Sequence, residues 1–128
     1  MAKLSIRIDF EGGSLGPGKV RLLELIAETG SIRKAAVGMK MSYGKAWLLL
    51  KALEDTFGAP LIDTSTSGKA GGGAKLLPLG KQVVERYRGL EGAAGRAARL
   101  HLSALVAKAK TPSFKGATKQ PVKRNVLK

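Results

Sequence analysis

Two helical patterns separated by only three residues lie between Gly30 and Gly58, and this spacing constrains the fold more than any other feature of the chain. Ser31 and Ser42 each precede one of the patterns and are placed to cap its free backbone amides. The second pattern repeats its apolar residues at intervals of four, three and four, at Ala46, Leu50, Leu53 and Phe57. The length fits a helix-turn-helix, and a generic pair of packed helices is the alternative.

The segments before this unit predict a strand and a first helix. Residues 3–10 alternate apolar and polar side chains, which is the period of a half-buried strand. Glycines and a proline interrupt the chain between residues 12 and 17. The next apolar residues fit one face of a helix that ends near Gly30, and they are Val20, Leu23, Ile26 and Ala27.

The segments after it predict a hairpin and a long helix. Residues 60–64 and 74–77 fit two short strands joined by a glycine-rich tip, which makes the hairpin a candidate wing. From Pro78 to about Ala107, apolar side chains recur at helical spacing and form a stripe that is suited to packing against another helix. The residues of this stripe are Val83, Tyr87, Leu90, Ala94 and Ala97. Glycines at 89, 92 and 95 oppose this helix, or else permit close approach of a second backbone.

The charge of the chain predicts an acidic partner. Lysine and arginine number 23 against 9 acidic residues, for a formal net charge of +14 and a pI near 10.5. Residues 108–128 contain seven basic residues and no acidic one. We expect them to form a disordered basic tail that adds phosphate contacts.

Several other classes of protein fit poorly. The chain has no cysteine and only one histidine, His101, so thiolate metal sites and a Ser-His-Asp triad lack parts. His101 is expected at a helix surface or a dimer interface. The acidic pairs Glu54-Asp55 and Glu24 with Glu28 are expected to be solvated or ion-paired. The glycine-rich segment around Lys69 lacks the Ser or Thr that a phosphate-binding loop needs after its lysine. We therefore expect no enzyme, no cofactor, no membrane span and a cytoplasmic location.

The start of the second helix carries the candidate DNA contacts. In a helix-turn-helix, the second helix places its N-terminal residues in the major groove. Ser42 can cap this helix and contact a DNA phosphate. Tyr43 can stack or donate a hydrogen bond to the DNA backbone, and Lys45 can reach a base edge or a phosphate. Trp47 is expected to pack against the first helix, because its large apolar area suits a core.

Three motifs resemble the N-terminal domain of ModE-type molybdate-responsive transcriptional regulators, which are relatives of the LysR-type winged helix. They are residues 30–36, residues 41–47 and the glycine-rich segment 68–74, and the similarity covers about residues 14–90. The resemblance implies a winged helix-turn-helix that dimerises through its long helices and regulates promoters. The candidate DNA-binding residues are therefore Ser31, Arg33, Lys34, Ser42, Tyr43, Lys45, Lys69 and Lys75.

The chain departs from this family at three places. Gly44 stands in the first turn of the recognition helix, where a longer side chain is common, and Leu77-Pro78 replaces a leucine-threonine pair before the last helix. The chain ends at Lys128, which leaves no room for the family's oxyanion-binding domain, so we expect no molybdate binding within it.

The overall expectation is a mostly α fold with a small β wing. Residues 1–77 hold the strand, the helix-turn-helix and the wing, residues 78–107 form the dimerisation helix of the same domain, and 108–128 form the tail. The predicted function is sequence-specific regulation by a homodimer on double-stranded DNA. A nonspecific architectural or nucleoid protein is the alternative.

Overall fold

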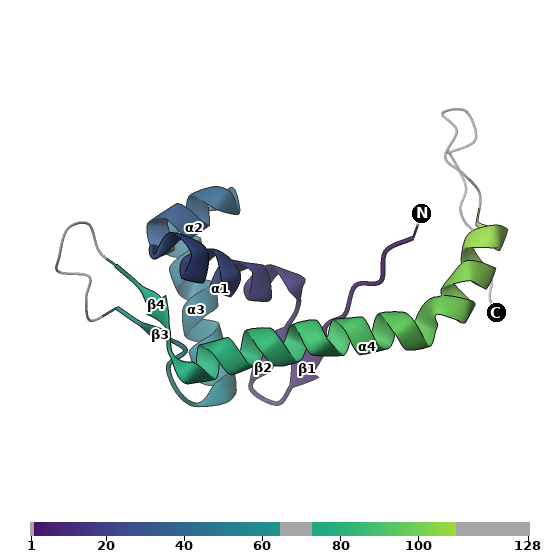
Figure 1. Ribbon diagram of the computed structural model, residues 1–128. Coiled ribbons are helices and arrows are strands. Elements are labelled where there is room, and N and C mark those ends of the chain that lie inside the picture. The colour runs from purple at the N-terminus through teal and green to yellow at the C-terminus, as the bar shows by residue number, and fades with distance from the viewer. Residues whose placement is uncertain (1, 65–72, 110–128) are drawn as a thin grey trace. The chain divides into compact units, whose positions relative to one another are not determined.

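The computed structural model describes residues 2–64 and 73–109 (Figure 1). Four helices and two short antiparallel strand pairs make up these residues, which confirms the expected mostly α class with a small wing. In chain order the elements are β1 (Ile8–Phe10), β2 (Gly13–Leu15), α1 (Pro17–Thr29), α2 (Ile32–Gly38), α3 (Tyr43–Phe57), β3 (Ile62–Asp63), β4 (Lys75–Leu76) and α4 (Pro78–Lys108).

Two compact units divide the chain. The first comprises residues 3–96 and contains every element up to the first turns of α4. The second comprises residues 97–128 with the first two residues, and its described residues are Ala2 and 97–109, which include the end of α4. His101 is exposed there, as expected of a helix-surface histidine.

The helix-turn-helix forms as the local sequence predicts. The side-chain oxygen of Ser31 accepts a hydrogen bond from the Lys34 amide, and that of Ser42 accepts one from the Lys45 amide, each at 3.0 Å. Between the helices, the chain turns through Lys40, whose φ of 58° is unusual for a residue with a side chain. The Met41 amide then donates to the Ala36 carbonyl at 3.0 Å, which closes the turn against α2.

The N-terminal strand is shorter than predicted and has a partner that was not predicted. Only Ile8–Phe10 is in a strand, and it pairs with Gly13–Leu15 in antiparallel register, with Ile8 opposite Leu15. The alternating residues 3–7 do not form a strand, because β2 has only three residues and these pair with Ile8–Phe10. The hairpin is held near α3 by an edge-to-face contact between Phe10 and Phe57, whose ring centroids lie 5.4 Å apart.

The core lies where α1, α2 and α3 meet. α1 buries Val20, Leu22, Leu23 and Ile26, whereas Ala27 is exposed, so its place on the predicted face was wrong. α3 buries Ala46, Leu50 and Leu53 as predicted, and Phe57 is half-buried beside them. Burial of this aliphatic set is the main stabilising contribution of the fold.

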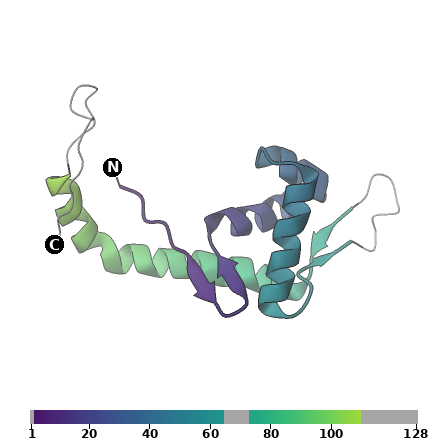
Figure 2. The same ribbon diagram turned by 180° about the vertical axis from the view of Figure 1, so that it is seen from behind.

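The wing is tied to the core at its base. The Ala74 amide donates to the Gly30 carbonyl, and the Leu77 amide donates to the Leu61 carbonyl, both at 2.8 Å. β3 and β4 pair with Ile62 opposite Leu76, and the tip between residues 65 and 72 lies outside the described residues. Figure 2 shows this hairpin projecting beyond α3 on the side away from β1 and β2.

The long helix α4 begins at Pro78 and runs continuously through all three opposing glycines to Lys108. Its start requires a glycine at position 80, because a Cβ there would collide with the backbone carbonyl oxygen of Leu61. Along the predicted stripe, Val83 and Tyr87 are buried within the chain's own fold, whereas Leu90 stays exposed. The first half of the stripe therefore serves the core of this chain.

Candidate nucleic-acid interface

The N-terminal turn of α3 presents the residues expected to contact DNA. Ser42, Tyr43 and Lys45 are all exposed, and the Ser42 cap fixes the direction in which the helix leaves the turn. Behind them, Ala46 is completely buried, so this turn is anchored to the core on one side and open to solvent on the other. The side chains are thus held at the surface by a rigid helix.

Arg33 and Tyr43 join the two helices of the motif. The Arg33 guanidinium lies over the Tyr43 ring, 4.8 Å from its centroid, so the structure brings these two predicted residues into contact. Lys34 is exposed on the same short helix, and Ser31 is half-buried, where its hydroxyl is used by the cap. Ser31 therefore has a structural role that is visible in the fold.

The wing contributes one described candidate. Lys75 is exposed on β4, one residue after the amide of Ala74 that bonds to Gly30. Because Gly30 immediately precedes Ser31, this bond holds the start of β4 next to the start of α2. Lys69 lies outside the described residues.

The surface formed by α2 and the start of α3 is free of acidic side chains. Neither helix has an acidic residue in its first turn. Glu54, further along α3, pairs with Lys51 at 3.3 Å, and on α1 Arg21 pairs with Glu24 at 3.4 Å and Glu28 at 3.2 Å. The helix N-termini and the basic side chains together favour a phosphate-bearing partner.

Three exposed residues of α3 were not predicted as part of this surface: Trp47, Leu48 and Lys51. Trp47 was expected to pack against the first helix, and this was wrong: it is 44% exposed and lines a small pocket with Pro60, Leu61 and Ile62. The helical spacing that marked Ala46, Leu50 and Leu53 as buried also marks the opposite positions as outward, and that signal could have found Leu48 and Lys51.

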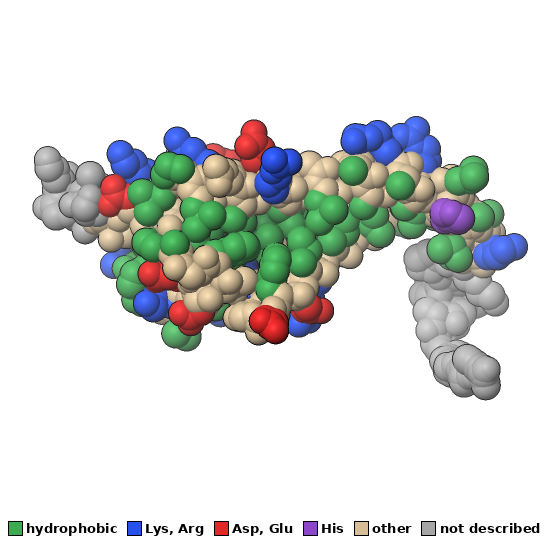
Figure 3. Space-filling model, turned by 90° about the horizontal axis from the view of Figure 1, so that it is seen from below, with side chains coloured by type: hydrophobic (Ala, Val, Ile, Leu, Met, Phe, Trp, Pro, Cys, Tyr) green, Lys and Arg blue, Asp and Glu red, His purple; other side chains and the backbone are tan. Residues whose placement is uncertain are grey.

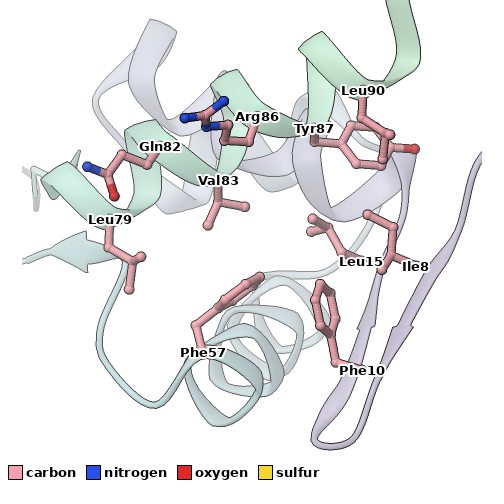
Figure 4. Close-up of a pocket in the computed structure, with 10 residues that line it drawn as sticks. All are labelled: Ile8, Phe10, Leu15, Phe57, Leu79, Gln82, Val83, Arg86, Tyr87 and Leu90. Atoms are coloured by element: carbon pink, nitrogen blue, oxygen red, sulfur yellow. The ribbon is translucent and has the colours of Figure 1, made fainter. Parts of the chain in front are cut away.

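A second surface of a different kind lies between α4, the end of α3 and the β1–β2 hairpin. Figure 3 shows apolar side chains gathered over this face, and Figure 4 shows the side chains around its cavity of about 320 Å³. Phe10 and Leu90 are each 41% exposed there. The cavity is lined by Ile8, Phe10, Leu15, Phe57, Leu79, Gln82, Val83, Arg86, Tyr87 and Leu90.

One ion-pair network links α1 to α4 beside these surfaces. Arg88 donates to both carboxylate oxygens of Glu24 at 2.9 Å, and to Glu91 at 2.7 Å. These hydrogen bonds lower the pKa of the Glu24 carboxyl and raise the pKa of Arg88. Burial raises the pKa of Tyr87, whose hydroxyl donates to the Ile6 carbonyl at 2.6 Å.

Across residues 2–64 and 73–109, no three His, Cys, Asp or Glu side chains are grouped so that they could hold a metal ion. In the same ranges, no helix combines the length and apolar character needed to span a membrane.

The sequence matches one protein family over half of its length. Residues 18–81, from α1 to the first turn of α4, match the family of bacterial regulatory helix-turn-helix proteins of the lysR type. This match spans the motif, the wing and the helix that precedes them.

Curated relatives confirm the resemblance to ModE-type regulators. The chain is 39% identical over 80 residues to the molybdenum-pterin-binding protein MopB of Rhodobacter capsulatus, covering 62% of this chain and 30% of that protein. It is 35% identical over 91 residues to the molybdenum transport protein ModE of Azotobacter vinelandii, covering 71% and 33%. The transcriptional regulator ModE of Haemophilus influenzae is 39% identical over 77 residues, covering 60% and 30%. The matched segment thus spans about a third of each relative.

A solved structure supports the same fold. The DNA-binding domain of CbnR in complex with DNA superposes with a TM-score of 0.53 at 23% identity, covering 68% of this chain and 94% of that domain. The winged-helix arrangement is therefore shared.

Proposed function

The chain belongs to the lysR family of bacterial regulatory helix-turn-helix proteins, and from this we propose that it is a sequence-specific DNA-binding transcriptional regulator. The observation that carries the proposal is the exposed start of α3, where Ser42, Tyr43 and Lys45 stand on a capped and anchored helix. In this proposal α3 enters the major groove, and Lys75 with the wing approaches the adjacent phosphates.

The roles of the contacting residues differ. Lys45 reads a base edge, because it lies at the start of α3 and its side chain is exposed. Arg33 and Lys34 neutralise phosphates, and Ser31 and Ser42 orient the backbone amides at the two helix starts. Lys69 and the basic residues after Lys108 add phosphate contacts in the same proposal.

The proposed regulator acts as a homodimer. The partner copy covers the apolar face around Phe10 and Leu90, and so places a second recognition helix on the same side of the duplex. Two-fold symmetry then requires an operator with two related half-sites separated by whole helical turns.

The test is selection of bound duplexes from a random library at about 150 mM salt, where nonspecific phosphate binding is weakened. A regulator enriches one sequence. In Lys45→Ala, the preference for that sequence over random duplexes collapses, whereas Arg99→Ala, with the same loss of charge on α4, keeps it. A nonspecific architectural protein gives no enriched sequence and weakens uniformly in both variants.

We further propose that these residues bind DNA without molybdate, with no catalytic step and in the cytoplasm. The contacts named above join side chains and backbone amides of this chain directly to DNA, and none of them includes a bound oxyanion. Affinity for the selected duplex is therefore expected to stay the same when molybdate or tungstate is added. Tight stoichiometric binding of either oxyanion in calorimetry contradicts this part of the proposal alone.

A further inference from the structure

The side of α3 that faces away from the core has an exposed apolar residue at its centre. Gly44, Leu48 and Lys51 follow one another at intervals of four and three residues, so they lie on one side of the helix, and all three are exposed. The buried residues of α3 lie on the opposite side. Leu48 is 70% exposed, which makes it the most exposed large apolar side chain described on this helix.

The surroundings of Leu48 suit an anionic partner that also offers an apolar group. Lys45 is exposed one turn before it and Lys51 one turn after it, and Arg33 lies on the neighbouring helix over Tyr43. Duplex DNA presents one apolar group in its major groove, the C5-methyl group of thymine. A leucine in this groove has no hydrogen-bonding atom and can discriminate only by contact with that methyl group.

Gly44 allows the close approach that such a contact needs. A Cβ at this position would have only the Ser42 hydroxyl oxygen within 4 Å, at 3.9 Å, so the helix surface there is open to solvent. Because position 44 has no side chain, this side of the helix can approach the groove floor more closely than a longer residue would permit. The next outward side chain along the helix is Leu48.

We propose that Leu48 is a specificity-determining residue that contacts the C5-methyl group of a thymine in each half-site, with Gly44 providing the clearance. This proposal rests on the function proposed above, and it adds the base type that the recognition helix selects. Leu48 recognises thymine by burying its methyl group, whereas Lys45 contacts bases by hydrogen bonding.

The test begins with the wild-type protein and the duplex selected from the random library. Each thymine of the half-site is replaced in turn by deoxyuridine, which removes the methyl group and leaves base pairing intact. At one thymine, affinity is expected to fall about fourfold, as for the burial of one methyl group. If no thymine shows this loss, the proposal for Leu48 is wrong even though the protein is a sequence-specific regulator.

The second step assigns the methyl contact to Leu48. Leu48→Ala should bind the thymine and deoxyuridine duplexes equally at that position, whereas Val37→Ala, equally exposed on α2, should keep the fourfold difference. Leu48→Gln should shift the preference at that position towards adenine. Retention of the methyl effect in Leu48→Ala overturns the assignment, and failure to select any duplex overturns the proposed function instead.

Discussion

The guanidinium of Arg88 on α4 donates two hydrogen bonds, each of 2.9 Å, to the carboxylate of Glu24 on α1. The same guanidinium bonds to Glu91 on its own helix, so its orientation is fixed from two sides. A bidentate pair of this geometry sets both the spacing and the rotation of two helices. It therefore links the helix that supports the motif to the helix proposed to carry the dimer contact.

Glu24→Gln is expected to destabilise the fold at neutral pH by about 1 kcal/mol, since the pair is partly exposed and screened by solvent. The pKa of Glu24 is lowered in the folded protein, so the stabilisation is present above the carboxyl's ordinary value of 4.5 and is lost as the pH falls through the lower folded value. Thermal unfolding measured from pH 7 to pH 2 should show the two proteins converging at the acid end.

Asp9→Asn is the matched control for this prediction. Asp9 pairs with Arg7 at 2.9 Å, but both side chains are more than 70% exposed, so little stability should depend on them at any pH. An equal loss of stability in both variants at pH 7 means that the α1–α4 pair has no special role.

Gly80→Ala should destabilise the fold by about 1–3 kcal/mol, because the added methyl group meets the Leu61 carbonyl oxygen and either α4 or the wing base must move. Gly92→Ala on the same helix is the control. It is exposed, its added Cβ meets only the end of the Arg96 side chain at 3.4 Å, and it should gain up to about 1 kcal/mol. Chemical denaturation of both variants measures the difference, and similar behaviour of the two glycines contradicts the close packing at position 80.

The helix-turn-helix could be predicted because its signals are local. Ser31 and Ser42 cap the helices that follow them, and the apolar spacing on α3 identifies the buried side within one segment. The β1–β2 pairing could not be predicted in this way, because β2 is only Gly13–Leu15 and carries no alternating pattern of its own. Its place depends on packing against Phe57, more than forty residues away.

The candidate DNA contacts could be predicted only in part, because some of them depend on tertiary packing and not on local sequence. Sequence spacing locates Tyr43 and Lys45 at the start of α3, but the approach of Arg33 to the Tyr43 ring is a tertiary contact across the turn. The prediction for Trp47 was wrong because it relied on the large apolar area of the side chain and not on its position along α3. That position turns Trp47 away from the buried side of the helix and towards Pro60 and Leu61. The position along the helix was the better guide.

Arg33→Ala should reduce the salt dependence of binding to the selected duplex, because one phosphate contact is removed. The slope of log affinity against log salt should become shallower by about 0.9. Arg33→Lys should keep the slope, since the charge remains, while affinity still falls because the planar stacking on Tyr43 is lost. A slope that is unchanged in Arg33→Ala means that Arg33 holds Tyr43 in place and does not contact phosphate.

Leu90→Asp tests the proposed dimer face, because it places a charge at the apolar cavity that Phe10 also lines, at a side chain that is 41% exposed. Burying an unpaired carboxylate against a partner copy is unfavourable, so dimerisation should weaken about tenfold or more. Sedimentation measured over a range of concentrations gives the dimer constant directly. Val37→Asp, at a side chain 71% exposed on α2, is the control that adds the same charge elsewhere and should leave association unchanged. Equal association in the two variants would show that the partner copy binds another surface, and the apolar face around Leu90 would then need a different explanation.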